Sequence, residues 1–198
     1  DEMVTKNNIE PTIWYRTNGQ YATYNRAIGI GVNGGTRYIP PLQAFWTRVC
    51  DGKITGCMQV SNLMCSHQES SLLKKIDIPE SREVIRFFLN SGDYSDEIAL
   101  IVSPKAEIGF DNEDSEKFYF QNAEAPYVYF YSNGKKLAIN SIPMDHNNMS
   151  IPIILNNKKN NECSLKTSRI NLINPNLEIF LEDKVKKAIA QRVSSGNG

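Results

Sequence analysis

Several features are scarce in this 198-residue sequence, and each scarcity excludes a class of protein. No apolar run reaches the roughly 18 residues that a membrane-spanning helix requires. Lysine plus arginine and aspartate plus glutamate both number 22, so no basic excess marks a general nucleic-acid-binding protein. Only 2 histidines accompany 4 cysteines, and no C-x-x-C spacing of a zinc site occurs. We therefore expect no membrane span, no nucleic-acid partner and no zinc centre.

Two of the cysteines, Cys50 and Cys57, flank a short loop that contains Gly52 and Gly56. A disulfide between them is geometrically feasible, but its formation depends on a distance that the sequence does not give. Free thiols packed as small apolar groups are the equally supported alternative.

Strand-forming residues are abundant, with 9 tyrosines, 8 phenylalanines and 2 tryptophans. Short apolar or alternating segments are separated by glycine, proline or asparagine about every ten residues. This pattern predicts an all-β fold, specifically an antiparallel β-sandwich of jelly-roll type. We expect an N-terminal β part (residues 1–80), a sandwich part packed on it (residues 81–184) and a tail (residues 185–198) with helical spacing over residues 185–193.

The clearest predicted element is a hairpin formed by residues 83–90 and 98–102 around a polar turn at Gly92. We expect it to bury Phe88, Ile98 and Leu100. Three further strand pairs are predicted: residues 12–17 with 20–24, residues 127–131 with 136–140, and residues 42–49 with 58–63. The last pair would place Trp46 in the core.

Acidic residues gather at the turn of this hairpin and again after it. Their carboxylates are hard oxygen donors, and Ca²⁺ takes about six to eight such ligands in flexible geometry. The candidate calcium ligands are Asp93, Asp96, Glu97, Asp111 and Asp114. The alternative is a set of solvated turns in which aspartates cap local N–H groups. A glycosidase would need a deep cleft around two such carboxylates, and the sequence gives no support for one.

A second candidate site combines aromatic and cationic residues near glycine-rich loops. Aromatic faces beside amide and guanidinium groups commonly capture sugars or proteins. The candidate ligand-binding residues are Tyr21, Tyr24, Arg37 and Tyr38, which we expect to be exposed.

Two short motifs do not support a catalytic or nucleotide site. Gly29, Gly31 and Gly34 fit a G-x-G-x-x-G pattern, but no apolar parallel strand precedes them and no helix follows, so we expect no dinucleotide cofactor. The run Cys65-Ser66-His67 places a thiol, a hydroxyl and an imidazole together in sequence. A nucleophile and its base usually meet in space rather than in sequence, so we expect no hydrolytic site there.

Six segments, taken in order, resemble one protein family: residues 34–46, 62–67, 94–97, 109–111, 136–143 and 181–184. They are similar to the β-rich segment near the C-terminus of Bacteroidetes surface proteins that the type IX secretion system exports. The resemblance runs from about residue 14 to residue 184. It implies an all-β module of a secreted or cell-surface protein, incomplete at its upstream side and without a known catalytic set.

We therefore expect a non-catalytic module that spaces the other domains of a surface protein and takes part in partner binding. The alternative is an adhesion module that binds a glycan or a host protein and is stabilised by calcium. A hydrolase is the least favoured interpretation.

Overall fold

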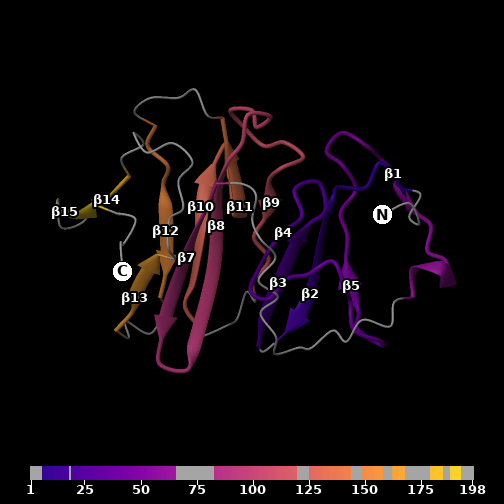
Figure 1. Ribbon diagram of the computed structural model, residues 1–198, viewed down its shortest axis with the longest axis horizontal. Helices are drawn as coiled ribbons and strands as arrows, with labels where there is room; N and C mark the ends of the chain where they lie inside the picture. The colour runs from indigo at the N-terminus through magenta and orange to yellow at the C-terminus, as the bar shows by residue number, and fades with distance from the viewer. Residues whose placement is uncertain are drawn as a thin grey trace.

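Strands make up nearly all the regular structure of the computed structural model (Figure 1). It describes residues 6–17, 19–65, 83–119, 125–143, 149–157, 162–167, 179–184 and 188–192. Within these ranges the helical content is one 3₁₀ turn, η1 (Asn62–Met64), and no helix has the length and apolarity of a membrane span. The prediction of an all-β fold is confirmed.

The smaller of the two main sheets is built from the N-terminal part of the chain. It contains β2 (Thr12–Thr17), β3 (Gln20–Asn25), β4 (Ile30–Val32) and β5 (Phe45–Trp46), in the order β4-β3-β2-β5. All of its pairs are antiparallel. The predicted hairpin of β2 and β3 is confirmed, because Thr17 pairs with Gln20 across a tight turn. Gly19 adopts the positive φ of 79° that such a turn favours.

The larger sheet has the order β12-β10-β11-β8-β7-β13, and β9 pairs with β11 off this path. Its strands are β7 (Glu83–Ser91), β8 (Tyr94–Val102), β9 (Ser115–Glu116), β10 (Tyr127–Ser132), β11 (Lys135–Ile142), β12 (Ile153–Asn156) and β13 (Ser164–Thr167). The predicted β7–β8 and β10–β11 hairpins are both present. The β8–β11 pair is parallel, unlike the others in this sheet. The sandwich is therefore mixed, and its strand order does not establish a jelly roll.

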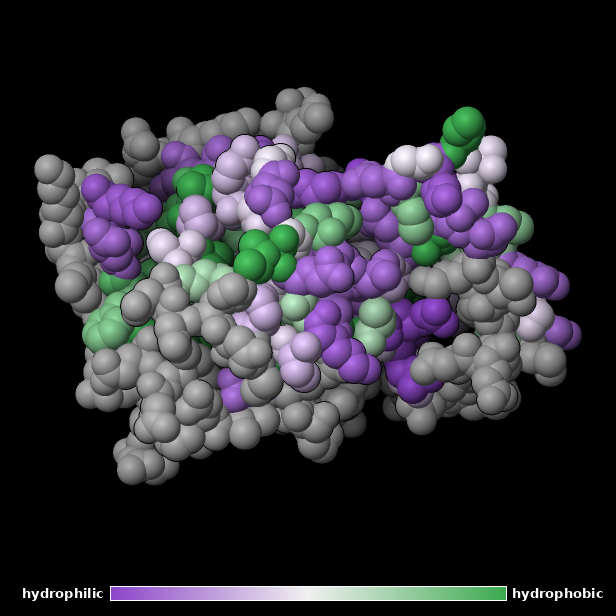
Figure 2. All heavy atoms as spheres, turned by 90° about the horizontal axis from the view of Figure 1, so that it is seen from above, coloured by the Kyte–Doolittle hydropathy of each residue, from purple (hydrophilic) through white to green (hydrophobic). Residues whose placement is uncertain are grey.

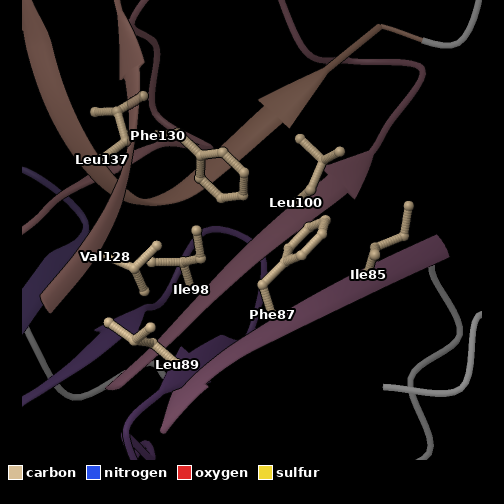
Figure 3. Close-up of a cluster of buried hydrophobic side chains, with 8 residues drawn as sticks. All are labelled: Ile85, Phe87, Leu89, Ile98, Leu100, Val128, Phe130 and Leu137. Carbon is tan, nitrogen blue, oxygen red and sulfur yellow. The ribbon is translucent and has the colours of Figure 1, made fainter. Parts of the chain in front are cut away.

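The large sheet is apolar on both faces at β7 and β8. On one face, buried side chains from β7, β8, β10 and β11 point toward one another (Figure 3): Ile85, Phe87, Leu89, Ile98, Leu100, Val128, Phe130 and Leu137. A second buried cluster joins the other face to the small sheet: Ile28, Ile30, Val32, Val84, Ala99, Ile101, Ala138 and Ile139. Burial on both sides explains why residues 98–102 are continuously apolar.

The alternation of β7 corrects one expected core residue. Phe87 pairs with Ile98, and both belong to the same buried cluster. Phe88 pairs with Glu97 and is only half-buried. Phe87, not Phe88, therefore packs with Ile98, because successive strand residues point to opposite faces.

The prediction of a long strand over residues 42–49 was wrong. Only β5 forms there, and it pairs with β2 rather than with residues 58–63. Strand β6 (Cys57–Met58) instead pairs with β1 (Lys6–Asn7). Because β5 is the edge strand of the small sheet, Trp46 is 42% exposed and does not lie in the core.

The helix expected in residues 185–193 was also wrong. Residues 188–192 form β15 (Ala188–Arg192), which pairs antiparallel with β14 (Phe180–Asp183). Helical spacing is a weak preference, and pairing with a neighbouring strand overrides it here. The predicted boundary near residue 80 lies outside the described residues.

The described part of the molecular surface is mostly hydrophilic on the face that Figure 2 shows. On the face shown in Figure 2, hydrophobic side chains stand singly or in small groups among hydrophilic ones. Scattered exposed apolar residues are normal for folded proteins.

Candidate functional site: an aromatic hollow

A hollow of about 200 Å³ lies where the β2–β3 turn meets the start of β8 and the segments between β9 and β10. Its aromatic lining comes from four separate parts of the chain: Tyr21, Tyr94, Phe118, Tyr119 and Tyr127. Polar groups share the lining, among them Gln20, Asn33, Asp93, Ser95, Asp96 and Lys117. Aromatic faces beside a few polar groups are typical of ligand sites.

Ring-to-ring contacts fix the positions of these aromatic side chains. Tyr21 meets Phe118 edge-on, with ring centroids 5.6 Å apart. Phe118 stacks on the buried Trp14 at 4.4 Å. On the other side of the hollow, Tyr119 stacks on Tyr127 at 4.6 Å. The lining is therefore held in place before any ligand arrives.

Tyr119 is held by a further contact, whereas Tyr94 is exposed to solvent. Lys136 Nζ donates a hydrogen bond to the hydroxyl of Tyr119 at 3.0 Å and also lies 4.8 Å from the centre of that ring. Tyr94 is 57% exposed and stands at the mouth of the hollow. Tyr94 is thus the lining ring with most of its surface accessible.

The charged pair Asp96 and Lys117 forms the floor of the hollow. Lys117 Nζ lies 2.6 Å from Asp96 Oδ1, and both side chains are about 95% or more buried. Asp96 also accepts hydrogen bonds from Asn33 Nδ2 at 2.9 Å and from the Val128 backbone N–H at 2.9 Å. Lys117 Nζ donates in addition to the Glu97 carbonyl. These bonds tie the small sheet to β8 and β10, and they neutralise the floor.

Glu97, another predicted calcium ligand, likewise joins the two sheets. Its carboxylate lies 2.6 Å from the Arg86 guanidinium and accepts a hydrogen bond from the Asn33 backbone N–H at 2.7 Å. Arg86 also donates to the Gly31 carbonyl at 2.8 Å. Both carboxylate oxygens are therefore bound by protein groups.

Asp111 and Asp114 lie in the segment that leads from β8 to β9. Asp111 accepts hydrogen bonds from the backbone N–H groups of Glu107 at 2.8 Å and Glu113 at 2.6 Å. Asp114 accepts from the backbone N–H groups of Asp111 at 2.9 Å and Ser141 at 2.7 Å. Apart from the bond between Asp114 and Ser141, these are the local capping contacts expected if the aspartates cap turns and bind no calcium.

The five predicted calcium ligands thus do not meet at one place. Asp93 is an exposed residue of the β7–β8 turn, while Asp96 and Glu97 are engaged with cations. In the described ranges no group of three or more histidine, cysteine, aspartate or glutamate side chains is placed to hold a metal ion. Their proximity in the sequence suggested a cluster, but Asp96, Glu97 and Asp114 bond to different distant groups, and Asp111 bonds to backbone N–H groups of its own segment.

Asp114 should make stability depend on pH. Burial raises the pKa of this carboxyl from 3.8 to about 7, despite two backbone hydrogen bonds that favour the charged form. Because folding raises this pKa, the folded state holds the proton more tightly than the unfolded state does. The stabilisation from the protonated carboxyl is complete below about pH 4 and is lost as the pH rises through about 7, which lowers the free energy of unfolding by on the order of 4 kcal/mol. Asp114→Asn should remove this slope in urea unfolding measured between these limits.

The matched control for this experiment is Asp93→Asn, which alters an exposed carboxyl. It should retain the pH dependence of the unmodified chain. Equal slopes for Asp114→Asn and the unmodified chain would contradict the assignment.

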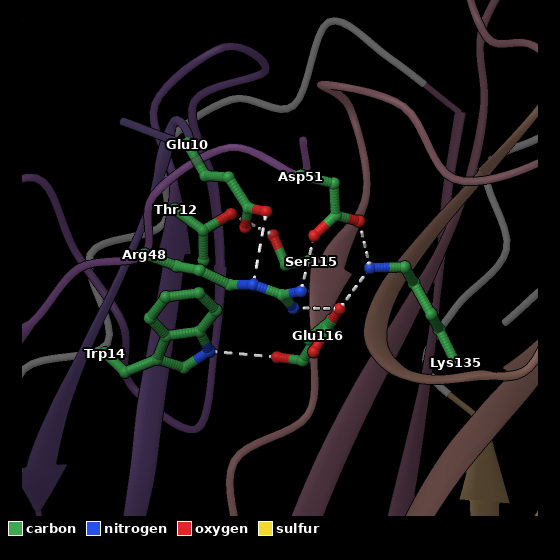
Figure 4. Close-up of polar contacts among 8 residues, drawn as sticks. All are labelled: Glu10, Thr12, Trp14, Arg48, Asp51, Ser115, Glu116 and Lys135. Atoms are coloured by element: carbon green, nitrogen blue, oxygen red, sulfur yellow. Dashed lines mark hydrogen bonds and ion pairs between the residues drawn. The ribbon is translucent and has the colours of Figure 1, made fainter. Parts of the chain in front are cut away.

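A second polar cluster, drawn in Figure 4, lies around Arg48. Arg48 forms ion pairs with Glu116, with Asp51 at 2.7 Å and with Glu10 at 3.6 Å. Lys135 forms ion pairs with Asp51 at 2.8 Å and Glu116 at 2.6 Å. Burial is the main cause that raises the pKa of Glu10. The cluster joins the loop around residue 50 to β9 and β11.

Two neutral contacts extend this junction between the sheets. Trp14 Nε1 donates to the Glu116 carbonyl at 2.9 Å, and the hydroxyls of Thr12 and Ser115 share a hydrogen bond of 2.8 Å. The partners are more than 100 positions apart in the sequence, so no local pattern could have indicated them. We assign this cluster a structural role.

Of the predicted ligand-binding residues, only Tyr21 lines the hollow. Tyr24 was wrongly expected to be exposed and is 8% exposed. Arg37 is exposed, and its guanidinium lies 5.5 Å from the ring centre of the half-buried Tyr38. Tyr21 and Tyr24 are an odd number of positions apart on β3, so their side chains leave opposite faces of the sheet.

Cys50 and Cys57 are free thiols in the structure, the former half-buried and the latter exposed. Each contacts the N-terminal segment: the Cys50 N–H donates to the Asn8 carbonyl at 2.9 Å, and Cys57 pairs with Asn7. The free-thiol alternative therefore describes this structure. Ser66 and His67 of the Cys65-Ser66-His67 run lie outside the described residues.

Comparisons with known proteins identified no relative of this chain. No family model, curated protein or solved structure matches the chain. The resemblance to type IX-exported surface proteins stays a prediction. The geometry of the aromatic hollow is the structural observation that bears on function.

Proposed function

We propose that the chain is a non-catalytic module of a secreted or cell-surface bacterial protein and that it binds a neutral glycan in the aromatic hollow. The observation that carries the proposal is a tyrosine-rich lining, with the exposed Tyr94 at its mouth, above a charge-neutralised floor. Tyrosine rings offer broad apolar faces to the C–H surface of a sugar, and their hydroxyls remain available for polar contacts. Gln20, Asp93 and Ser95 supply further polar groups in the same lining.

The bonding of the charged floor favours a neutral ligand and a non-catalytic role. Asp96 and Lys117 neutralise each other, and their remaining bonds go to protein groups. A catalytic acid or base must lie within hydrogen-bond reach of the reacting group. Groups committed to holding two sheets together are poorly suited to that role.

Location and assembly are part of the same proposal. The order of the six segments that resemble type IX-exported proteins supports export to the bacterial surface, in a protein of the Bacteroidetes type. The other domains of that protein would be the first partners of this module. Hydrogen bonds join the two sheets: Asn33, which follows β4, bonds to Asp96 and Glu97 of β8, and Gly31 of β4 bonds to Arg86 of β7. They favour a rigid unit, which also supports a second candidate function as a spacer without a ligand.

The test is a glycan array probed with the fluorescently labelled chain and with its Tyr94→Ala variant. We expect binding to neutral glycans, with affinity reduced about two- to tenfold by the variant, because one stacked ring contributes about 0.5–1.5 kcal/mol. Tyr131→Ala is the matched control, since Tyr131 is 46% exposed and does not line the hollow.

Loss of affinity in both variants would contradict the assignment of the hollow. If no glycan on the array is bound, glycan binding is excluded and the spacer function is favoured. Binding of a host protein that is weakened by Tyr94→Ala, without binding of any glycan, would favour a host-protein ligand over a glycan in the same hollow.

A further inference from the structure

We propose that Trp46 forms a second subsite continuous with the aromatic hollow, so that the ligand is a linear oligosaccharide rather than a single sugar. This inference rests on the proposed glycan-binding function and names the class of glycan. It depends on the register of the small sheet, on the gradient of exposure across it, and on the size of the hollow.

The register places Trp46 and Tyr21 on one face of the small sheet. Trp14 pairs with Trp46, and Arg16 pairs with Tyr21. Trp14 and Arg16 are two positions apart on β2, so their side chains and those of their paired residues leave the same face. Phe118, which stacks on Trp14, identifies this face as the one turned toward the large sheet.

Exposure along this face rises from the middle of the sheet to its edge. Trp14 on β2 is fully buried, whereas Trp46 on the edge strand β5 is 42% exposed. Tyr21 contacts Trp46 edge-on, with ring centroids 5.3 Å apart, and itself lines the hollow. The aromatic surface of the hollow therefore continues through Tyr21 onto an accessible indole.

The size of the hollow sets how much ligand it can take. Its volume of about 200 Å³ is below the roughly 300–1,000 Å³ of pockets that enclose drug-sized ligands. A glycan of several units must extend beyond it. Trp46 offers the adjoining apolar face, and an indole stacks well on the C–H face of a sugar ring.

The test measures affinity against chain length by titration calorimetry. The probes are soluble β-1,4-linked glucose and N-acetylglucosamine oligosaccharides, from the monosaccharide to the hexasaccharide. We expect the unmodified chain to bind the hexasaccharide of at least one series about tenfold or more tightly than its monosaccharide. Trp46→Ala should reduce that ratio to near one.

Phe45→Ala is the matched control. Phe45 is the neighbouring exposed aromatic residue of β5, but it pairs with Tyr15 and leaves the opposite face. It should preserve the gain of affinity with length. Circular dichroism and urea unfolding of both variants show whether each is folded.

The outcomes separate this inference from the proposed function. Binding with equal affinity at all lengths, or an unchanged ratio in Trp46→Ala, overturns the second subsite and leaves glycan binding intact. Binding by no saccharide of either series counts against glycan binding itself, and the second subsite falls with it.

Discussion

Replacing Lys117 by methionine should lower the free energy of unfolding by about 3–5 kcal/mol. The substitution leaves the Asp96 carboxylate buried without its cation, and breaking a buried ion pair on one side carries a cost of this size. Asn33 and Val128 would still donate hydrogen bonds to Asp96, but they cannot neutralise it. Equilibrium urea unfolding followed by circular dichroism measures the change.

Two further variants give this prediction its controls. The exposed Lys105→Met should change stability by less than about 0.5 kcal/mol, as surface substitutions usually do. The double variant Asp96→Asn with Lys117→Met should be more stable than Lys117→Met alone, because no unpaired charge stays buried. A double variant as unstable as the single one would show that the cost is lost packing rather than uncompensated charge.

Trp14→Ala should destabilise the chain by about 3–5 kcal/mol, the range observed when a buried large aromatic residue is truncated. Trp14 is fully buried, stacks on Phe118 and donates a hydrogen bond to the Glu116 carbonyl. It therefore joins the small sheet to the segment around β9. Thermal and urea unfolding should both detect the loss.

Trp46→Ala is the natural comparison, because Trp46 is the register partner of Trp14 on the neighbouring strand. With 42% of its surface exposed, its truncation should cost less than about 1.5 kcal/mol. Similar losses for the two variants would mean that the small sheet does not pack on the large one as described. A reversed order would place Trp46, not Trp14, in the core.

Local sequence patterns were sufficient to predict three of the four proposed strand pairs, those of β2 with β3, β7 with β8 and β10 with β11. Gly92 and the dipeptide Asn133-Gly134 provide the backbone conformations that two-residue hairpin turns require, with positive φ at each of these residues. The continuous apolar run of residues 98–102 then indicated a strand that is covered on both faces. These features depend on neighbouring residues alone.

The aromatic hollow could be predicted only in part, because it depends on how distant segments meet. Tyr21, Tyr94 and Tyr127 come from three separate strands. Their proximity results from the packing of the small sheet on the large one, which no spacing in the sequence expresses. The error at Tyr24 was avoidable, since strand alternation alone places it opposite Tyr21.

The acidic residues were predicted to lie together because they are close in sequence, but in the structure they bond to different partners. Asp96 and Glu97 are adjacent in sequence, but they bind different cations, Lys117 and Arg86 respectively. Composition suggested a shared metal ligand set because it counts carboxylates without their partners. Once long-range ion pairs and backbone amides are present, few of these oxygens are left for a metal.

The parallel pairing of β8 with β11 has a consequence for how the chain assembles itself. The β7–β8 hairpin forms between segments that are adjacent in the sequence. Leu100 of β8, in contrast, pairs with Asn140 of β11, and β9 and β10 lie between these two strands in the sequence. Closing so long a loop carries an entropic cost before any contact offsets it, and non-local pairings of this kind slow folding. As the polypeptide emerges from the ribosome, the backbone groups on one side of β8 therefore stay unpaired until β11 has been synthesised, which leaves that edge open to mispairing.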